Sequence, residues 1–260
     1  MTVQTPPRRG ADVSATALYC YGVTAADTAS PLPGAGLGGA SVEVARFGEL
    51  AALTSAVSAG TVRARRRDLL THFDVLGTAF EAGTVLPLRF GIVFADERAV
   101  VEEFLRPRQD ELVGLLRELA GHVELRVTAH YREEAILAEA VRESPRIAQL
   151  RAATRGGAAA GHPALLELGE LVAAEVQRRT AQDASALLER LRPLARRHEL
   201  DQEPIEYQVL RASFLVERDR VARFDAALEE FARDNAGRID FKYVGPLPPH
   251  SFVSLGDGGR

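Results

Sequence analysis

The chain has one cysteine and no tryptophan among its 260 residues. A single cysteine, Cys20, excludes an intrachain disulfide and any zinc site built from several cysteines. Cys20 stands within an apolar strand pattern, so we expect a small buried residue there and no reactive thiol.

Long apolar runs and a strong net charge are missing as well. No run reaches the roughly 18 apolar residues that a transmembrane helix requires, and residues 1–15 lack the apolar core of a signal peptide. The formal net charge of −4 gives no reason to expect nucleic acid or an anionic membrane as a partner. We therefore expect a soluble, cytoplasmic protein in which residues 1–15 form a disordered tail.

Sequence motifs for catalysis and metal binding are also lacking. The six histidines include no H-x-x-x-H pair and no carboxylate at a metal-site spacing. Adjacent glutamates such as Glu102 and Glu103 diverge by about 100° on a helix, which suits a solvated face and not an acid/base pair. There is no nucleophile elbow and no P-loop. An enzyme is not supported, and we expect no catalytic residue, no cofactor and no metal.

A glycine-rich segment between Gly34 and Gly39 matches G-x-G-x-x-G letter for letter. A dinucleotide site needs a strand that ends at the first glycine and a helix that starts at the last. Here the residues after Gly39 alternate as in a strand, so no helix N-terminus can receive a pyrophosphate. We interpret the segment as a turn-rich loop.

The most distinctive stretch of the chain runs from Val85 to Phe94 and has strand periodicity. Pro87, Arg89 and Gly91 lie on one of its two faces. The other face would be a continuous apolar wall made of Leu86, Leu88, Phe90, Ile92 and Phe94. Arg89 has two interpretations: an ion pair at a sheet edge, or an interface position around which Pro87 and Gly91 leave space.

Strands are expected around this stretch at 17–23, 42–47 and 50–57, although the alanines of 50–57 also suit a helix. Residues 68–82 form the clearest helix of this half, and residues 96–120 should form two helices or one kinked at Pro107. We expect His72 to be a surface or half-buried residue paired with Asp68. The stripe of the helix 68–82 consists of Leu69, Phe73, Leu76 and Phe80.

The second half begins with a half-exposed strand at 123–130. A mostly helical segment follows at about 132–200, including a long helix over 165–198, and the glycine- and alanine-rich residues 155–161 are its flexible break. A strand at 207–216, a helix capped by Asp219 and a strand at 239–243 then form a βαβ unit. The sequence predicts an α+β fold with two domains, 16–120 and 121–260, the second ferredoxin-like with a helical insertion.

Several of these segments together resemble one known family. They are the aromatic strand from Leu18 to Val23, Phe47 with the small-residue segment after it, His72, the stretch from Val85 to Phe94, and the ending from Gly245 to Val253. The chain resembles the gas vesicle accessory proteins of the GvpF/GvpL family over nearly its whole length. Leu247 and His250 depart from the family ending, which usually has Trp and Tyr at these two positions.

The resemblance implies a two-domain α+β protein that is a minor component or assembly factor of gas vesicles. It also implies the hydrophobic shell protein GvpA and other accessory proteins as partners, and a location with the vesicle. Covering GvpA before assembly would prevent its aggregation. A ferredoxin-like, small-molecule-binding regulatory protein remains the alternative. The candidate partner-binding residues are Pro87, Arg89, Gly91, Pro246, Pro248, Pro249 and His250.

Overall fold

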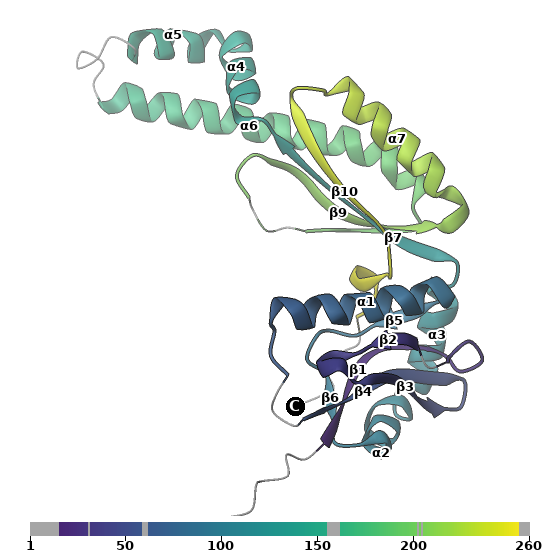
Figure 1. Ribbon diagram of the computed structural model, residues 1–260. Helices are drawn as coiled ribbons and strands as arrows, with labels where there is room; N and C mark the ends of the chain where they lie inside the picture. The colour runs from purple at the N-terminus through teal and green to yellow at the C-terminus, as the bar shows by residue number, and fades with distance from the viewer. Residues whose placement is uncertain are drawn as a thin grey trace, which may run out of the picture. The chain divides into compact units, whose positions relative to one another are not determined.

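The computed structural model describes residues 16–30, 32–58, 62–154, 162–201, 203 and 205–254. It has a mixed α/β architecture, and the chain divides into two compact units, Met1–Ala120 and Gly121–Arg260 (Figure 1). The predicted disordered tail 1–15 and the predicted flexible break 155–161 lie outside the described residues.

The described strands of the first unit form one antiparallel sheet in the order β2-β3-β4-β1-β5, and β6 also pairs with β1. β1 is the central strand and is buried along almost its whole length because it has neighbours on both edges. The strands are β1 (Thr16–Ala25), β2 (Leu32–Ala35), β3 (Ser41–Phe47), β4 (Leu50–Ser58), β5 (Val85–Pro87) and β6 (Val93–Phe94). The 50–57 segment is therefore a strand and not a helix.

The helices of the first unit are α1 (Arg66–Ala82), α2 (Glu97–Ala99) with a π-turn over Val100–Leu105, and α3 (Gln109–Leu119). Pro107 lies between the π-turn and α3, as its missing N–H requires. The stripe of α1 is rotated from the prediction. Phe73 is 51% exposed and His72 only 1% exposed, so the prediction of a surface or half-buried His72 was wrong. Tyr19 and Leu88 supply hydrogen-bond partners to the buried imidazole, as described below.

The predicted single strand from Val85 to Phe94 is in fact two short pieces. β5 and β6 pair with the same strand β1. The Leu88 N–H and the Ile92 carbonyl still bond to Tyr21 and Cys20 of β1, and residues 89–91 leave the ladder between them. Gly91 has φ +102°, a backbone conformation that suits glycine and departs from a strand. The apolar wall consequently ends after Leu88, because Phe90 and Phe94 are half-buried and Ile92 is 36% exposed.

The second unit has an antiparallel sheet whose described strands run in the order β10-β7-β9-β8. The strands are β7 (His122–Tyr131), β8 (Arg197–Leu200), β9 (Gln208–Glu217) and β10 (Ile239–Leu247). The helices are α4 (Glu133–Glu143), α5 (Pro145–Thr154), α6 (His162–Leu191) and α7 (Val221–Asp234). Short 3-10 turns occur at Leu37–Gly39, Arg192–Leu194, Arg218–Arg220 and His250–Phe252.

Two predictions for the second unit need correction. The long helix ends at Leu191 and not near His198, because Pro193 follows and the chain enters the edge strand β8. Asp219 does not cap α7. It lies in the 3-10 turn Arg218–Arg220, which continues directly into the helix, so its side chain is not at the N-cap position.

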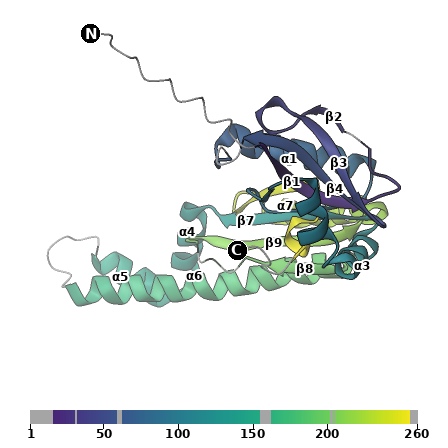
Figure 2. The same ribbon diagram turned by 90° about the horizontal axis from the view of Figure 1, so that it is seen from below.

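One face of the second sheet is apolar and covered by helices. Leu125, Val127 and Phe214 are fully buried on it, and α6 and α7 pack against each other and against β9 and β10. Figure 2 shows α6 running beside the sheet and continuing past it to α5. The opposite face carries polar side chains such as Arg126 and Arg211, so this sheet has a core face and an open polar face.

Candidate interaction surfaces

The three predicted interface residues of the first unit lie in different environments. Pro87 is buried in β5, opposite Gly22 of β1, and is part of the core. Arg89 and Gly91 are exposed in the loop between β5 and β6. The structure thus separates Pro87 from the other two and leaves Arg89 and Gly91 as surface candidates.

A buried polar centre holds this loop in place. The Tyr19 hydroxyl lies 2.8 Å from His72 Nδ1, and His72 Nε2 lies 3.2 Å from the Leu88 carbonyl oxygen. The Gly91 N–H donates to the Tyr19 hydroxyl at 3.2 Å. Since a carbonyl only accepts, Nε2 carries the proton, and the Tyr19 O–H donates to Nδ1. Leu88 of the loop is thus tied to His72 and Gly91 to Tyr19.

Burial also sets the acid–base chemistry of β1. It raises the pKa of the Tyr19 phenol well above its usual range, although the Gly91 N–H acts in the opposite direction. Burial raises the pKa of the Cys20 thiol to about 12. Cys20 is thus an inert core residue, which agrees with the sequence interpretation.

Large apolar side chains are exposed around the same loop. Phe73 and Phe90 both place their rings against the His72 imidazole, at centroid distances of 5.5 and 5.7 Å. Leu70 lies one turn before Phe73 on α1, on the same side of the helix. We call the exposed residues Leu70 (53%), Phe73 (51%), Ile92 (36%) and Val93 (39%) the apolar loop surface. Val93 pairs with Tyr19 and so lies on the side of the sheet that α1 covers, whereas Ile92 precedes it at the end of the loop. Exposed apolar side chains of this size are typical of protein interaction sites.

The predicted residues of the C-terminal segment differ in exposure. Pro246 is exposed, whereas Pro248 and Pro249 are buried and His250 is half-buried. The Gly245–Pro246 peptide bond is cis. A side chain at Gly245 would come within 2.6 Å of Leu125, so the segment passes very close to β7. The segment therefore lies against its own sheet at Gly245, and Pro246 is its one exposed proline.

Glu124 anchors that segment from within the sheet. Its side chain is fully buried, and its carboxylate accepts hydrogen bonds from the Ser251 N–H at 2.7 Å and the Ser251 hydroxyl at 2.8 Å. Ser213 donates to it at 3.1 Å, and Arg126 is its ion-pair partner at 2.5 Å. The strand periodicity had placed Glu124 on a half-exposed face. The C-terminal segment covers it instead, and sequence reasoning missed this contact because the two sites are far apart in the chain.

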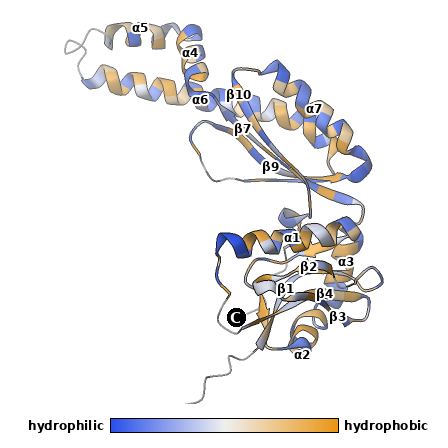
Figure 3. Cartoon of the chain, viewed as in Figure 1, coloured by the Kyte–Doolittle hydropathy of each residue, from blue (hydrophilic) through white to orange (hydrophobic). Residues whose placement is uncertain are grey.

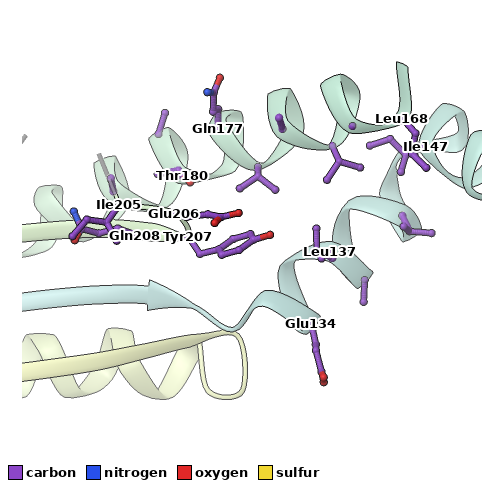
Figure 4. A pocket seen from close by; sticks show the side chains of 18 of the residues that line it. Glu134, Leu137, Ile147, Leu168, Gln177, Thr180, Ile205, Glu206, Tyr207 and Gln208 are labelled. Carbon is purple, nitrogen blue, oxygen red and sulfur yellow. The ribbon is translucent and has the colours of Figure 1, made fainter. Parts of the chain in front are cut away.

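Two hollows occur in the described part of the second unit. A cavity of about 320 Å³ lies on the open polar face between Arg126, Arg211 and Ser251. A larger groove of about 1140 Å³ lies between α4, α5, α6 and the residues before β9 (Figure 4). The groove was not predicted from the sequence, because its walls come from helices that are separate in the chain and were each considered alone.

Neither hollow contains metal-binding chemistry. The described residues contain no group of three or more His, Cys, Asp or Glu side chains placed to hold a metal ion. The glycine-rich segment Gly34 to Gly39 forms part of β2 and a 3-10 turn that leads into β3. Among the helices that the structure describes, none is long and apolar enough to cross a membrane.

Comparison with known proteins identifies the family. The sequence profile described as "Gas vesicle synthesis protein GvpL/GvpF" matches residues 17–254. The chain belongs to the GvpL/GvpF family. A gas vesicle protein F from a Streptomyces species is 38% identical over 206 residues, which cover 79% of this chain and 85% of the relative. The gas vesicle protein F of Microcystis aeruginosa is 26% identical over 92% of this chain and 98% of its own length.

Solved structures of the GvpL/GvpF family are similar to this chain in fold. The crystal structure of GvpF from Anabaena sp. superposes with a TM-score of 0.81, at 26% identity, over 93% of this chain and 99% of that protein. The GvpF crystal structure from Microcystis aeruginosa gives a TM-score of 0.75 at 25% identity. A gas vesicle accessory role follows from this membership, and the family is one of vesicle structure or assembly and not an enzyme family.

Proposed function

We propose that this chain binds the hydrophobic shell protein GvpA through the apolar loop surface and prevents GvpA aggregation while gas vesicles form. In this proposal it works in the cell as a protein associated with the vesicle. Its family membership supports the vesicle setting. The observation that carries the binding proposal is the exposed group at Leu70, Phe73, Ile92 and Val93.

The apolar loop surface has two properties that favour binding of an apolar partner: exposed apolar side chains and a loop that is held in one conformation. A strand-forming hydrophobic subunit aggregates through its unpaired edges and apolar faces. The loop that carries Arg89, Gly91 and Ile92 is held by the Tyr19–His72 pair, so little conformational entropy is lost when it binds. Arg89 lies in the same loop, next to the apolar residues, where it can orient a partner. Pro246 is the one exposed predicted residue of the C-terminal segment and is a weaker candidate.

Co-expression with GvpA tests this proposal. Phe73→Ser should weaken capture of GvpA by roughly tenfold or more, because an exposed aromatic anchor is lost. Leu165→Ser is the matched control, since Leu165 is 52% exposed and Phe73 is 51% exposed, and it should leave capture unchanged. Arg89→Ala should weaken capture as well. The readout is the fraction of GvpA that stays soluble and co-purifies with each folded variant.

Wild-type capture by Phe73→Ser and Arg89→Ala, with both variants folded, would overturn the proposal. Truncation after Val244 is a less informative test of the C-terminal segment. It removes Ser251 and Phe252 and leaves the Glu124 carboxylate without two of its hydrogen bonds, so we expect it to destabilise the second unit.

The alternative function is a ligand-binding regulatory protein. We propose a ferredoxin-like fold for residues 121–260, supported by the order β10-β7-β9-β8 and the alternation of strands and helices. The observation that favours a small ligand is the 320 Å³ cavity on the open face of this sheet. A thermal-shift screen with nucleotides and metabolites tests it. A saturable shift that Arg211→Ala abolishes would support this function, and no shift would exclude it for the compounds used.

A further inference from the structure

The groove beside α6 has the dimensions of a helix-binding site. Nine α6 residues between Leu168 and Ala184 form its floor at helical spacing. They span about 24 Å at a rise of 1.5 Å per residue. Leu137, Val141 and Ile147 form the facing wall from α4 and α5. Figure 3 shows hydrophobic residues along this part of α6. The floor is longer than most small ligands. The volume of the groove, about 1140 Å³, exceeds the usual range of small-molecule pockets.

The polar groups at one end of the groove are acceptors. Glu203 and Glu206 line it, and neither carboxylate forms an ion pair with a residue that the structure describes. Gln208 Oε1 is buried in the same region without a hydrogen-bond partner among the described residues. A buried acceptor without a donor is costly, so this end of the groove calls for N–H groups or positive charge.

The opposite end of the groove has the opposite charge. Arg151 lines it from α5, in the turn after Ile147, and Figure 4 shows Ile147 and Leu168 far from Gln208 and Ile205. A helix has a positive N-terminus and a negative C-terminus. A bound helix therefore fits with its N-terminus near Glu203, Glu206 and Gln208 and its C-terminus near Arg151.

The residue that shapes the acidic end is conformationally unusual. Tyr207 has φ +57°, which a non-glycine residue rarely adopts. Its carbonyl accepts from the Tyr131 N–H at 2.9 Å, and its ring extends into the groove between α4 and α6 (Figure 4). Such a backbone persists only where its surroundings hold it, so the backbone that carries this ring is held in place.

From these contacts we propose that the groove binds a basic amphipathic helix of a partner protein. The apolar face of that helix covers the α6 floor, and its lysines or arginines face Glu203 and Glu206. This is recognition of a helix in a groove, with charge setting its direction. It is a second site, on a different unit from the apolar loop surface, and it does not depend on GvpA capture there.

A synthetic peptide tests the proposal on the full-length protein. The probe is a fluorescein-labelled peptide of about 18 residues, roughly 27 Å as a helix, with leucines on one face and lysines on the other. A second peptide has the same leucines and glutamates in place of the lysines. Fluorescence anisotropy should show saturable binding of the lysine peptide, at least about tenfold tighter than the glutamate peptide.

Paired variants locate the binding site. Ala173→Asp places a charge on the apolar floor and should weaken binding of the lysine peptide roughly tenfold or more. Purely electrostatic attraction would have the opposite effect, because the new aspartate would attract the lysines. Ala174→Asp adds the same charge on the neighbouring exposed position of α6, outside the groove, and should have little effect. The double variant Glu203→Gln, Glu206→Gln should weaken binding and make it less dependent on salt concentration. Glu170→Gln, at an exposed position outside the groove, should change neither property.

Three results would overturn the proposal. The first is no saturable binding, or equal affinity for the two peptides. The second is equal loss with Ala173→Asp and Ala174→Asp while circular dichroism shows both variants folded. The third is evidence that something else occupies the groove. Sedimentation could show a dimer that Ala173→Asp dissociates and the peptide does not. Alternatively, laurate could bind, and Ala173→Asp but not Ala174→Asp would abolish its binding.

Discussion

Tyr19 and His72 show how two buried polar residues can position a surface. Each ring nitrogen of His72 has one partner, and the Tyr19 hydroxyl both donates to Nδ1 and accepts from the Gly91 N–H. The rings of Phe73 and Phe90 pack against the same imidazole. Phe73 and Phe90 therefore pack on a hydrogen-bonded pair of buried side chains. We expect removal of these hydrogen bonds to change the conformation of the loop that carries Phe90.

Tyr19→Phe tests this dependence. It removes the Tyr19 hydrogen bond to His72 Nδ1 and the acceptor of the Gly91 N–H, so we expect the free energy of unfolding to fall by about 1–3 kcal/mol. Chemical denaturation measures the loss, and hydrogen exchange at Gly91 should become faster. Tyr243→Phe is the control, because Tyr243 is 38% exposed and its loss should be smaller. Equal stability of wild type and Tyr19→Phe would contradict the assigned role.

His250 should make the stability of the second unit depend on pH. Burial lowers the pKa of His250 to about 4. The Glu124 carboxylate raises this pKa and the Arg126 guanidinium lowers it, and both effects are smaller than that of burial. An unfolded histidine has a pKa of about 6.5. Between these two values the unfolded chain binds the extra proton and the folded chain does not, so stability falls as the pH drops from about 6.5 towards 4.

His250→Gln should remove this contribution. We expect wild type to lose up to about 2–3 kcal/mol more than the variant between pH 7 and pH 4.5, after allowance for partial exposure. Denaturant titrations of both proteins across this range measure the difference. Parallel pH profiles for wild type and variant would show that the pKa of His250 is the same in the folded and the unfolded chain, which would contradict this prediction.

At the scale of elements, periodicity identified most strands and helices but not their interruptions. The stretch Val85 to Phe94 alternates correctly, yet Gly91 adopts a positive φ and the loop leaves β1. Alternation of apolar and polar residues indicates which side chains could share a face of a strand. It does not show whether the hydrogen bonds to the neighbouring strand continue along the whole segment. His72 was misplaced for a related reason, because its partner Tyr19 lies 53 residues earlier.

The site residues divide in the same way. Local patterns drew attention to Arg89 and Gly91, which the structure leaves exposed. They missed Glu124, since Ser251 covers it from 127 residues further along the chain. They also missed Arg179, which interrupts the apolar stripe of α6. Contacts between distant segments decide whether such a charge is solvated or buried, and one sequence does not contain that information.

Arg179 joins α4 to α6. Its side chain is 5% exposed and bonds to Glu139, to Glu143 at 2.8 Å and to Glu175 at 2.7 Å. Arg238 continues the network to Glu139 at 2.7 Å and to Asp183 at 2.6 Å. Arg178 and Arg179 hold the pKa of Glu175 at about 2. α4 and α6 are thus held together by charge as well as by apolar contact.

Arg179→Met should separate these helices. It removes the cation from three carboxylates, two of them largely buried, so we expect a loss of about 3–5 kcal/mol in the free energy of unfolding. Arg178→Met is the matched control, because Arg178 is half exposed and should cost well under about 1 kcal/mol. Thermal and urea denaturation compare the two. A loss of equal size for both variants would argue against the network.

At the scale of the whole molecule, each unit has a sheet and a buried core of its own. Leu53 of β4 is 1% exposed within the first core, and Leu125 of β7 is fully buried within the second. The order β2-β3-β4-β1-β5 and the order β10-β7-β9-β8 share no strand. Backbone hydrogen bonds of the two sheets therefore close within separate units, which allows the units to differ in stability.

This separation predicts that core damage stays local. Leu53→Ala should cost about 2–5 kcal/mol through loss of apolar contact and the cavity left behind, and Leu125→Ala should cost a similar amount. Hydrogen exchange with mass spectrometry should show faster exchange in β1 and β4 for the first variant and in β7 and β9 for the second. Faster exchange of all four strands in either variant would mean that the units unfold together. Local damage would allow GvpA capture and peptide binding to be disabled one at a time, each by a variant in its own unit.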